Sequence, residues 1–200
     1  MDCVPYTFCD AVVSTVRDIS SLNALLDSAN SAFAMWRSAL RPHRLNRRMV
    51  TLSIGCSDRN RWSYDLITDS QLISFKDLQE IPEKYLQVAV LGFLKNDRPR
   101  ASSFKEVHAI LNFISPFINR TELTLDDIKA SSGQITDLLQ SVNDAPFGEI
   151  ELVYYKNEFE EFLRNQINCA SLQIFKVSSY NCHVKALDLA AKWKEIEGNR

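Results

Sequence analysis

The sequence has no long apolar run, few glycines and prolines, and no large excess of either charge. Its 200 residues include five glycines and six prolines, and the net charge is −2. No stretch reaches the roughly 18–20 apolar residues of a membrane span, and the first residues lack the basic and apolar segments of a signal peptide. A nucleic-acid-binding protein would carry a basic surplus. We therefore expect a cytoplasmic or nuclear protein that binds neither membranes nor nucleic acids.

The sequence also lacks the motifs that carry a reaction or hold a metal ion. Five cysteines without paired spacing predict reduced thiols rather than a disulfide framework. Four converging zinc ligands cannot be assembled from the widely separated His43, His108 and His183. Glycine-rich phosphate loops and nucleophile motifs are absent. Acidic clusters such as Glu158–Glu161 fall where helices are predicted to begin, which favours a helix-capping role. We expect no catalysis, no metal and no cofactor.

A short strand-like pattern occurs three times in the second half of the chain. Its paired apolar positions are Leu123 with Leu125, Ile150 with Leu152, and Phe175 with Val177. Successive copies, counted from Leu125 to Leu152 to Val177, are 27 and 25 residues apart, and a helical segment lies between them. A unit of this size cannot bury its apolar face alone, so the units are expected to stack, strand beside strand, with helices covering one face.

This pattern resembles a leucine-rich repeat, whose period is roughly 20–29 residues. The later copies extend to Phe147-x-x-Ile150-x-Leu152 and Leu172-x-x-Phe175-x-Val177. Standard repeats place Asn or Cys three positions after the last inward Leu. In this sequence those positions hold Ile128, Tyr155 and Tyr180, so the copies lack the polar ladder of the family.

Periodicity predicts the remaining elements. Alternation predicts strands over Met49–Ile54 and Arg61–Thr68, joined as a hairpin. The continuous apolar run Tyr85–Leu94 predicts a strand buried on both faces. Helical spacing predicts helices over residues 75–81, 104–114, 134–142, 158–167 and 183–196.

Three short amphipathic helices are predicted in the first 40 residues. Their apolar positions are Phe8, Val12, Val13 and Val16 on one face of the first, Leu22, Leu25, Leu26 and Ala29 on the second, and Phe33, Trp36 and Leu40 on the third. So short a segment has a thin core and must pack against the next domain or a partner. Pro42 is expected to end the third helix. The basic run Arg41–Arg48 is interpreted as a solvated hinge; the alternative is a nuclear-import or phosphate-binding patch.

The spacing of Val4-Pro5, the apolar positions that follow and Trp36 resembles the F-box motif, with Val in place of the usual starting Leu. The resemblance covers about the first 40 residues, and F-box modules are often followed by leucine-rich repeats. It implies that these helices bind an adaptor of the Skp type. The residues expected to make that contact are Val4, Pro5, Phe8, Val12, Leu22 and Leu25.

The sequence thus predicts an α/β protein with a three-helix F-box-like module over residues 1–48 and a leucine-rich-repeat-like strand–helix stack over residues 49–200. The function implied is substrate recognition in an SCF-type ubiquitin ligase, with a Skp-type adaptor and a cullin ligase as partners and an unknown protein substrate. The alternative is a repeat scaffold with no ligase connection. An enzyme with an unrecognised site has the least support.

Strand geometry also predicts the surface that binds the substrate. Residues between the inward positions of each copy point to the other face, which places Thr124, Glu151 and Lys176 in one row, with the opposite charges of Glu151 and Lys176 side by side. Val153 and Tyr155 add apolar and aromatic groups of the kind found at binding hot spots. We predict that these five residues bind the partner; the alternative for Tyr155 is burial at the end of the strand.

Overall fold

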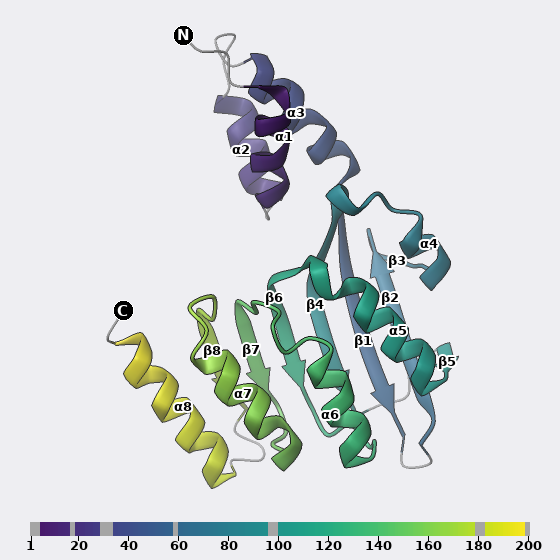
Figure 1. Ribbon diagram of the computed structural model, residues 1–200, viewed down its shortest axis with the longest axis vertical. Helices are drawn as coiled ribbons and strands as arrows, with labels where there is room; N and C mark the ends of the chain where they lie inside the picture. Colours follow the sequence, from purple (N-terminus) through teal and green to yellow (C-terminus); the bar gives the residue numbers. More distant parts are fainter. Residues whose placement is uncertain are drawn as a thin grey trace.

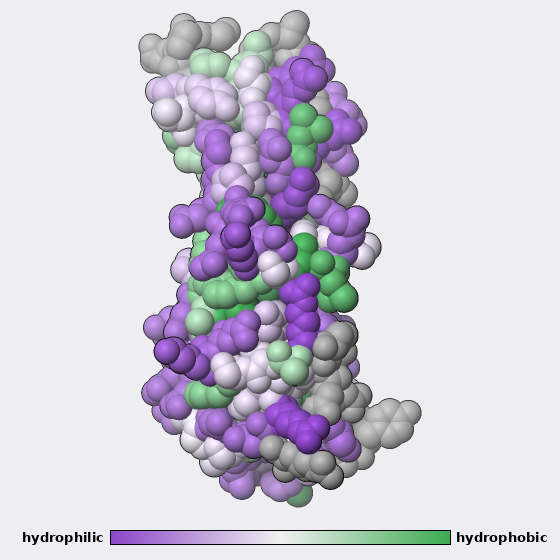
Figure 2. Space-filling view, turned by 90° about the vertical axis from the view of Figure 1, so that its right-hand side faces the viewer, coloured by the Kyte–Doolittle hydropathy of each residue, from purple (hydrophilic) through white to green (hydrophobic). Residues whose placement is uncertain are grey.

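The computed structural model describes residues 5–16, 19–28, 34–57, 60–95, 100–178 and 183–198. It shows a mixed α/β protein in which a small group of helices projects from one end of a larger sheet-and-helix body (Figure 1). The predicted α/β class is confirmed. On the side shown in Figure 2, hydrophobic residues form small separate patches among hydrophilic ones. No helix in these ranges has the length and apolarity needed to cross a membrane.

The projecting part consists of α1 (Tyr6–Thr15), α2 (Ile19–Ser28) and α3 (Ala34–Asn46). We call it the helical module. It has its own small core, which is separate from the core of the sheet and is formed by Cys9, Val13, Leu22, Ala39 and Leu40. The apolar face predicted for the first helix was right for Val13 and Val16, which pack in or against this core, and wrong for Phe8 and Val12. Cys9 and Val13 point inward, whereas Phe8 and Val12 are exposed, because α1 packs on α3 through its shorter apolar side chains.

The predicted end of the third helix at Pro42 was also wrong, since α3 continues to Asn46. A proline inside a helix costs about 3 kcal/mol or more. Burial on both sides of Pro42 offsets this cost, because Leu40 lies in the module core and His43 is fully buried at the junction with the sheet. Tertiary packing therefore outweighs the local preference at this position.

The sheet is mixed, with the strand order β3-β2-β1-β4-β6-β7-β8 and β5 paired to β2. The bounds of the strands are β1 (Arg48–Cys56), β2 (Trp62–Thr68), β3 (Gln71–Leu72), β4 (Leu86–Leu94), β5 (Arg100–Ser102), β6 (Ile118–Leu125), β7 (Glu149–Leu152) and β8 (Ile174–Val177). The predicted hairpin is present, because β1 and β2 are antiparallel neighbours. From β1 onward, β4, β6, β7 and β8 lie side by side in chain order and run parallel.

Helices connect the parallel strands and lie in front of the sheet in Figure 1. They are α5 (Phe104–Ile114), α6 (Ser132–Gln140) and α7 (Glu160–Ile167), with the short α4 (Phe75–Gln79) after β3, while α8 (Val184–Glu197) follows the last strand. Single 3-10 turns, η2 (Glu83–Tyr85), η3 (Ser115–Phe117) and η4 (Asn157–Phe159), precede β4, β6 and α7. The side-chain hydroxyls of Ser103 and Ser131 accept backbone N–H bonds at the starts of α5 and α6, which is the capping expected of serine.

The main core lies between the sheet and these helices. Leu123, Leu125, Ile150 and Leu152 are buried there. The prediction that the strand at Tyr85–Leu94 is buried on both faces holds for its second half, where Leu91 to Phe93 are all buried, but along the first half of β4 burial alternates. Its opposite side is only half-buried because the helices contact the other face of the sheet.

Candidate interaction surfaces

The strand register places the predicted row of residues together. Thr124 is the register partner of Glu151, and Glu151 is the partner of Lys176. The inward positions align in the same way, with Leu125 beside Leu152 and Leu152 beside Val177. The row therefore lies on the sheet face opposite the helices, which we call the open face.

The open face carries more acidic charge than the predicted row alone. Glu122 and Glu149 are register partners one pleat away from Glu151 on the same face. Lys176 forms its ion pair with Glu149 and not with its direct neighbour Glu151, which accepts a hydrogen bond from the Ser178 hydroxyl at 3.1 Å. Bonding to Glu149 raises the pKa of Lys176. The long lysine side chain reaches diagonally along the strands, a contact that strand register alone does not predict.

The predicted surface residue Tyr155 does not lie on the open face. Its side chain is 7% exposed, stacks on the ring of His183 at 4.7 Å, and donates a hydrogen bond of 2.9 Å from its hydroxyl to Glu160. Burial and the Glu160 carboxylate raise the pKa of Tyr155 to about 12. Tyr155 thus joins the loop after β7 to α7 and α8, in agreement with the alternative of burial at the end of the strand. Val153, the remaining predicted residue, is half-buried at the end of β7.

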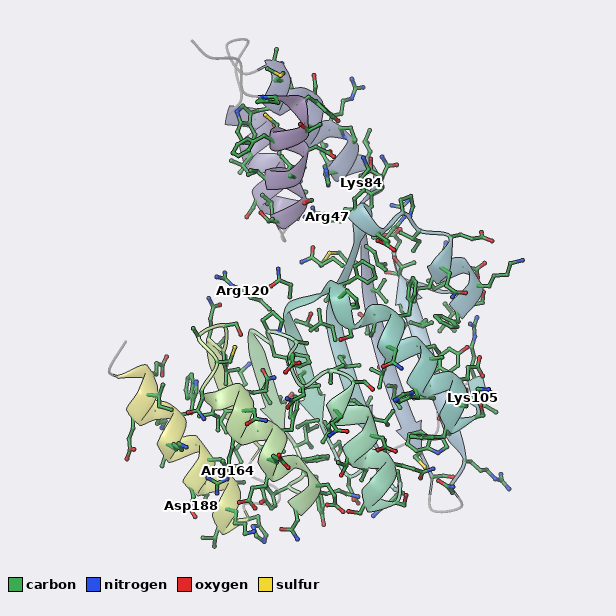
Figure 3. The ribbon with its side chains drawn as sticks, in the orientation of Figure 1. Arg47, Lys84, Lys105, Arg120, Arg164 and Asp188 are labelled. Carbon is green, nitrogen blue, oxygen red and sulfur yellow. The ribbon has the colours of Figure 1, made fainter. Side chains whose placement is uncertain are left out.

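Glu160 connects three parts of this region. Lys185 and Arg164 approach its carboxylate at 2.8 Å, and together with Tyr155 they lower its pKa to about 2. Glu160 is the first residue of α7, where the helix dipole also favours a negative charge. Figure 3 labels Arg164 on α7 and Asp188 on the adjacent α8. The arrangement holds two helices together and offers no acid–base pair to a substrate.

A second polar cluster fixes the loop after β6. Asp127 is nearly buried and pairs with Lys129 and with Lys156, the latter at 3.4 Å. Burial opposes ionisation of this carboxyl group, but the bonds from the two lysines outweigh it and lower the pKa of Asp127. Lys156 also donates to the backbone oxygen of Ile128. Because both lysines are committed to this loop, the cluster is structural.

The predicted adaptor-binding residues divide into exposed and buried ones. Phe8 is 53% exposed and packs edge-on against the Trp36 ring at 6.3 Å, and Val12, one turn later on α1, is also exposed. Pro5 and Leu25 are exposed as well. Leu22 is fully buried in the module core, so it cannot make the predicted contact. Val4 lies outside the described residues.

The junction between the module and the sheet contains charged residues that the sequence interpretation placed in a solvated hinge. His43 is fully buried, and its Nε2 lies 2.9 Å from an Asp10 carboxylate oxygen. The Tyr85 ring packs edge-on against the imidazole at 5.2 Å. Arg47 is also buried. The hinge interpretation was wrong for these two residues, because His43 contacts Asp10 of α1 and Tyr85 of the η2 turn and Arg47 bonds to the end of α1, whereas Arg41 and Arg44 are exposed.

The burial of His43 leads to a pH-dependent stability. Burial lowers the pKa of His43 below its usual 6.5 despite the Asp10 contact, and Arg47 and Lys84 also disfavour the charged form. The unfolded chain then binds more protons than the folded one below about pH 6.5, so stability is present above this pH and is lost as the pH falls. We expect urea denaturation to show lower stability at about pH 5.5 than at about pH 7.5.

The variant His43→Gln should flatten the pH dependence over this interval, whereas His108→Gln, a change at a half-exposed position on α5, should leave it unchanged. Asp127 and Glu160 act in a separate range, below their ordinary values near 4. An identical stability of the wild-type protein at the two pH values would contradict the role assigned to His43.

No known family, no curated protein and no solved structure matches this chain. Within the described ranges, no group of three or more His, Cys, Asp or Glu side chains is arranged to hold a metal ion. The features with functional character are therefore the exposed apolar side chains of the helical module, the open face of the sheet, and the polar junction between the two. Sequence reasoning missed the junction, since its residues come from segments far apart in the chain.

Proposed function

We propose that this protein is a non-catalytic substrate-recognition adaptor of an SCF-type ubiquitin ligase. The observation that carries the proposal is the set of exposed apolar side chains on the helical module. Tyr6, Phe8 and Val12 on α1 and Leu25 on α2 face outward, although the module has few apolar residues for its own core. Exposed apolar clusters on a soluble domain mark contact sites for other proteins.

The F-box-like spacing of Pro5, Phe8 and Trp36 supports a Skp-type adaptor as the partner of this surface. The leucine-rich-repeat-like arrangement of parallel strands in chain order supports a role of the open face in binding substrate. The protein would then raise the local concentration of substrate near the ubiquitin carrier without taking part in the chemical step.

Removing the exposed apolar groups of α1 tests the proposal. Phe8 and Val12 are one helical turn apart and share a face. The double variant Phe8→Ala/Val12→Ala should bind a purified Skp-type adaptor about tenfold more weakly or worse, since apolar anchors of this kind often contribute 1–2 kcal/mol or more. Isothermal titration calorimetry of the full chain with the adaptor measures this effect.

The matched control is Val184→Ala/Leu187→Ala, which removes two exposed apolar side chains from α8 at the other end of the molecule. It should bind the adaptor like the wild-type protein. If the wild-type protein shows no affinity for such an adaptor, the ligase assignment fails and the repeat scaffold remains as the alternative.

A further inference from the structure

A cavity of about 190 Å³ lies where the helical module meets the sheet. Its walls come from the end of α1, the residue between α3 and β1, the η2 turn with the start of β4, and the η3 turn with the start of β6. The polar residues in these walls include Ser14, Arg47, Lys84, Gln87 and Asn119. The cavity is therefore built from both parts of the molecule, and Arg47 and Lys84 contribute cationic groups to its walls.

Arg47 is buried in the wall of this cavity with unused bonding capacity. Its side chain is only 4% exposed, and Nη2 donates to the backbone oxygens of Val13 and Ser14 at 3.1 and 3.3 Å. Nη1 is buried and has no hydrogen-bond partner among the described residues. Among the residues that the structure describes, no carboxylate lies within ion-pair distance of the Arg47 guanidinium.

A buried cation without an anion is costly, because desolvation removes its hydration and the two bonds from Nη2 replace only part of it. Desolvation lowers the pKa of Arg47 from its usual value. The nearby Asp10 does not resolve the imbalance, since its carboxylate oxygens lie against His43 and Lys84. An unsatisfied buried group of this kind requires an explanation, and an anion in the adjoining cavity, whose wall Arg47 lines, would supply the missing counter-charge.

Other residues add to the positive character of this site. Lys84 lines the same cavity and is half-exposed, and Figure 3 shows Arg47 and Lys84 together at the junction. Glu83 also lines the cavity but is exposed to solvent. The amide of Gln87 provides a neutral donor in the wall.

We propose that this cavity binds a phosphate group, carried by inorganic phosphate or by a small phosphate monoester, with Arg47 and Lys84 as its cationic ligands. The planar fork of a guanidinium matches the oxygens of phosphate, and lysine adds a compact charge. The ligand contacts both the helical module and the start of the sheet, so its binding stabilises their junction. This site is independent of the adaptor surface on α1 and α2.

Titration of the full chain with inorganic phosphate and, separately, with phenyl phosphate tests the proposal, with sodium chloride at matched ionic strength as the reference. Calorimetry should show saturable binding at one site, and the melting temperature should rise with ligand concentration, because a ligand of the folded state stabilises it. Tighter binding of phenyl phosphate would identify a monoester as the ligand, and tighter binding of phosphate would identify the free ion.

Three variants assign the site. Arg47→Lys keeps one charge but loses the fork, and should weaken binding about tenfold or more. Gln87→Glu is isosteric, leaves the contacts of Arg47 with α1 intact, and should abolish binding by placing a carboxylate in the cavity. Lys105→Ala, an exposed change on the distant α5 (Figure 3), should bind like the wild-type protein.

If the wild-type protein shows no saturable binding up to about 10 mM of either ligand, the proposal is overturned. It is also overturned if Gln87→Glu binds both ligands as tightly as the wild-type protein. This second criterion does not depend on whether Arg47→Lys folds.

Discussion

Replacing Leu152 with alanine is expected to lower the free energy of unfolding by about 2–5 kcal/mol, the usual cost of truncating a buried leucine. Leu152 is 1% exposed in β7, and its neighbours in the sheet are Leu125 and Val177. Its side chain faces the helices, so the variant leaves a cavity in the main core. Urea denaturation of the two proteins, followed by circular dichroism, measures the difference.

The matched control is Val153→Ala at the next residue. Val153 is half-buried at the end of the strand, so its truncation should cost well under the loss at Leu152. The reverse result, with Val153→Ala severely destabilising and Leu152→Ala harmless, would mean that β7 turns its other face to the helices. The row predicted to bind the partner, Thr124, Glu151 and Lys176, would then lie in the core.

Replacing Gly148 with alanine is expected to destabilise the protein by about 1–3 kcal/mol, as overpacking at a buried site usually does. Gly148 lies directly before β7, where a Cβ atom would meet the backbone oxygen of Arg120 at 2.8 Å and its Cα at 3.0 Å. Arg120 has a positive φ of 55°. Neither backbone can yield easily, because Gly148 donates to the Thr121 oxygen and accepts from the N–H groups of Gln173 and Ile174.

The variant Gly133→Ala is expected to stabilise the protein, in contrast to Gly148→Ala. Gly133 lies in the first turn of α6, and a Cβ atom there would meet nothing within 4 Å. Alanine has the higher helix propensity, so this variant should gain up to about 1 kcal/mol. Thermal unfolding of both variants with the wild-type protein tests the pair. Equal effects at the two positions would contradict the close approach of β6 and β7 at Gly148.

Local patterns in the sequence were sufficient to predict most of the sheet-and-helix body. Alternating apolar residues identified β6, β7 and β8, and the similar spacing of the copies, 27 and 25 residues, predicted their side-by-side order and register, as in the alignment of Leu125, Leu152 and Val177. The apolar helical stripe predicted the helix over residues 104–114, and the structure has α5 over these residues with Ser103 as its cap. These features depend on residues close together in the chain, so periodicity and capping determine them.

The tertiary structure decided which of several similar side chains is buried or forms a contact within the chain. The sequence could not choose between Cys9 and Phe8 as the buried face of α1, because the choice depends on how closely α3 packs. Nor did it predict that Lys176 would pair with Glu149 rather than with the adjacent Glu151. For Tyr155 it left open whether the ring lies on the open face or is buried at the end of the strand, where the structure places it against Glu160.

The junction between the helical module and the sheet is the clearest case in which the sequence did not predict which residues are buried. A run of basic residues resembles a solvated segment when each residue is considered by itself, and a proline within it indicates the end of a helix. In the folded protein the helix continues, and His43 and Arg47 are buried against α1 and the η2 turn. Their burial depends on contacts among segments that are distant in the sequence. The free energy of those contacts, and no local propensity, determines where the charges lie.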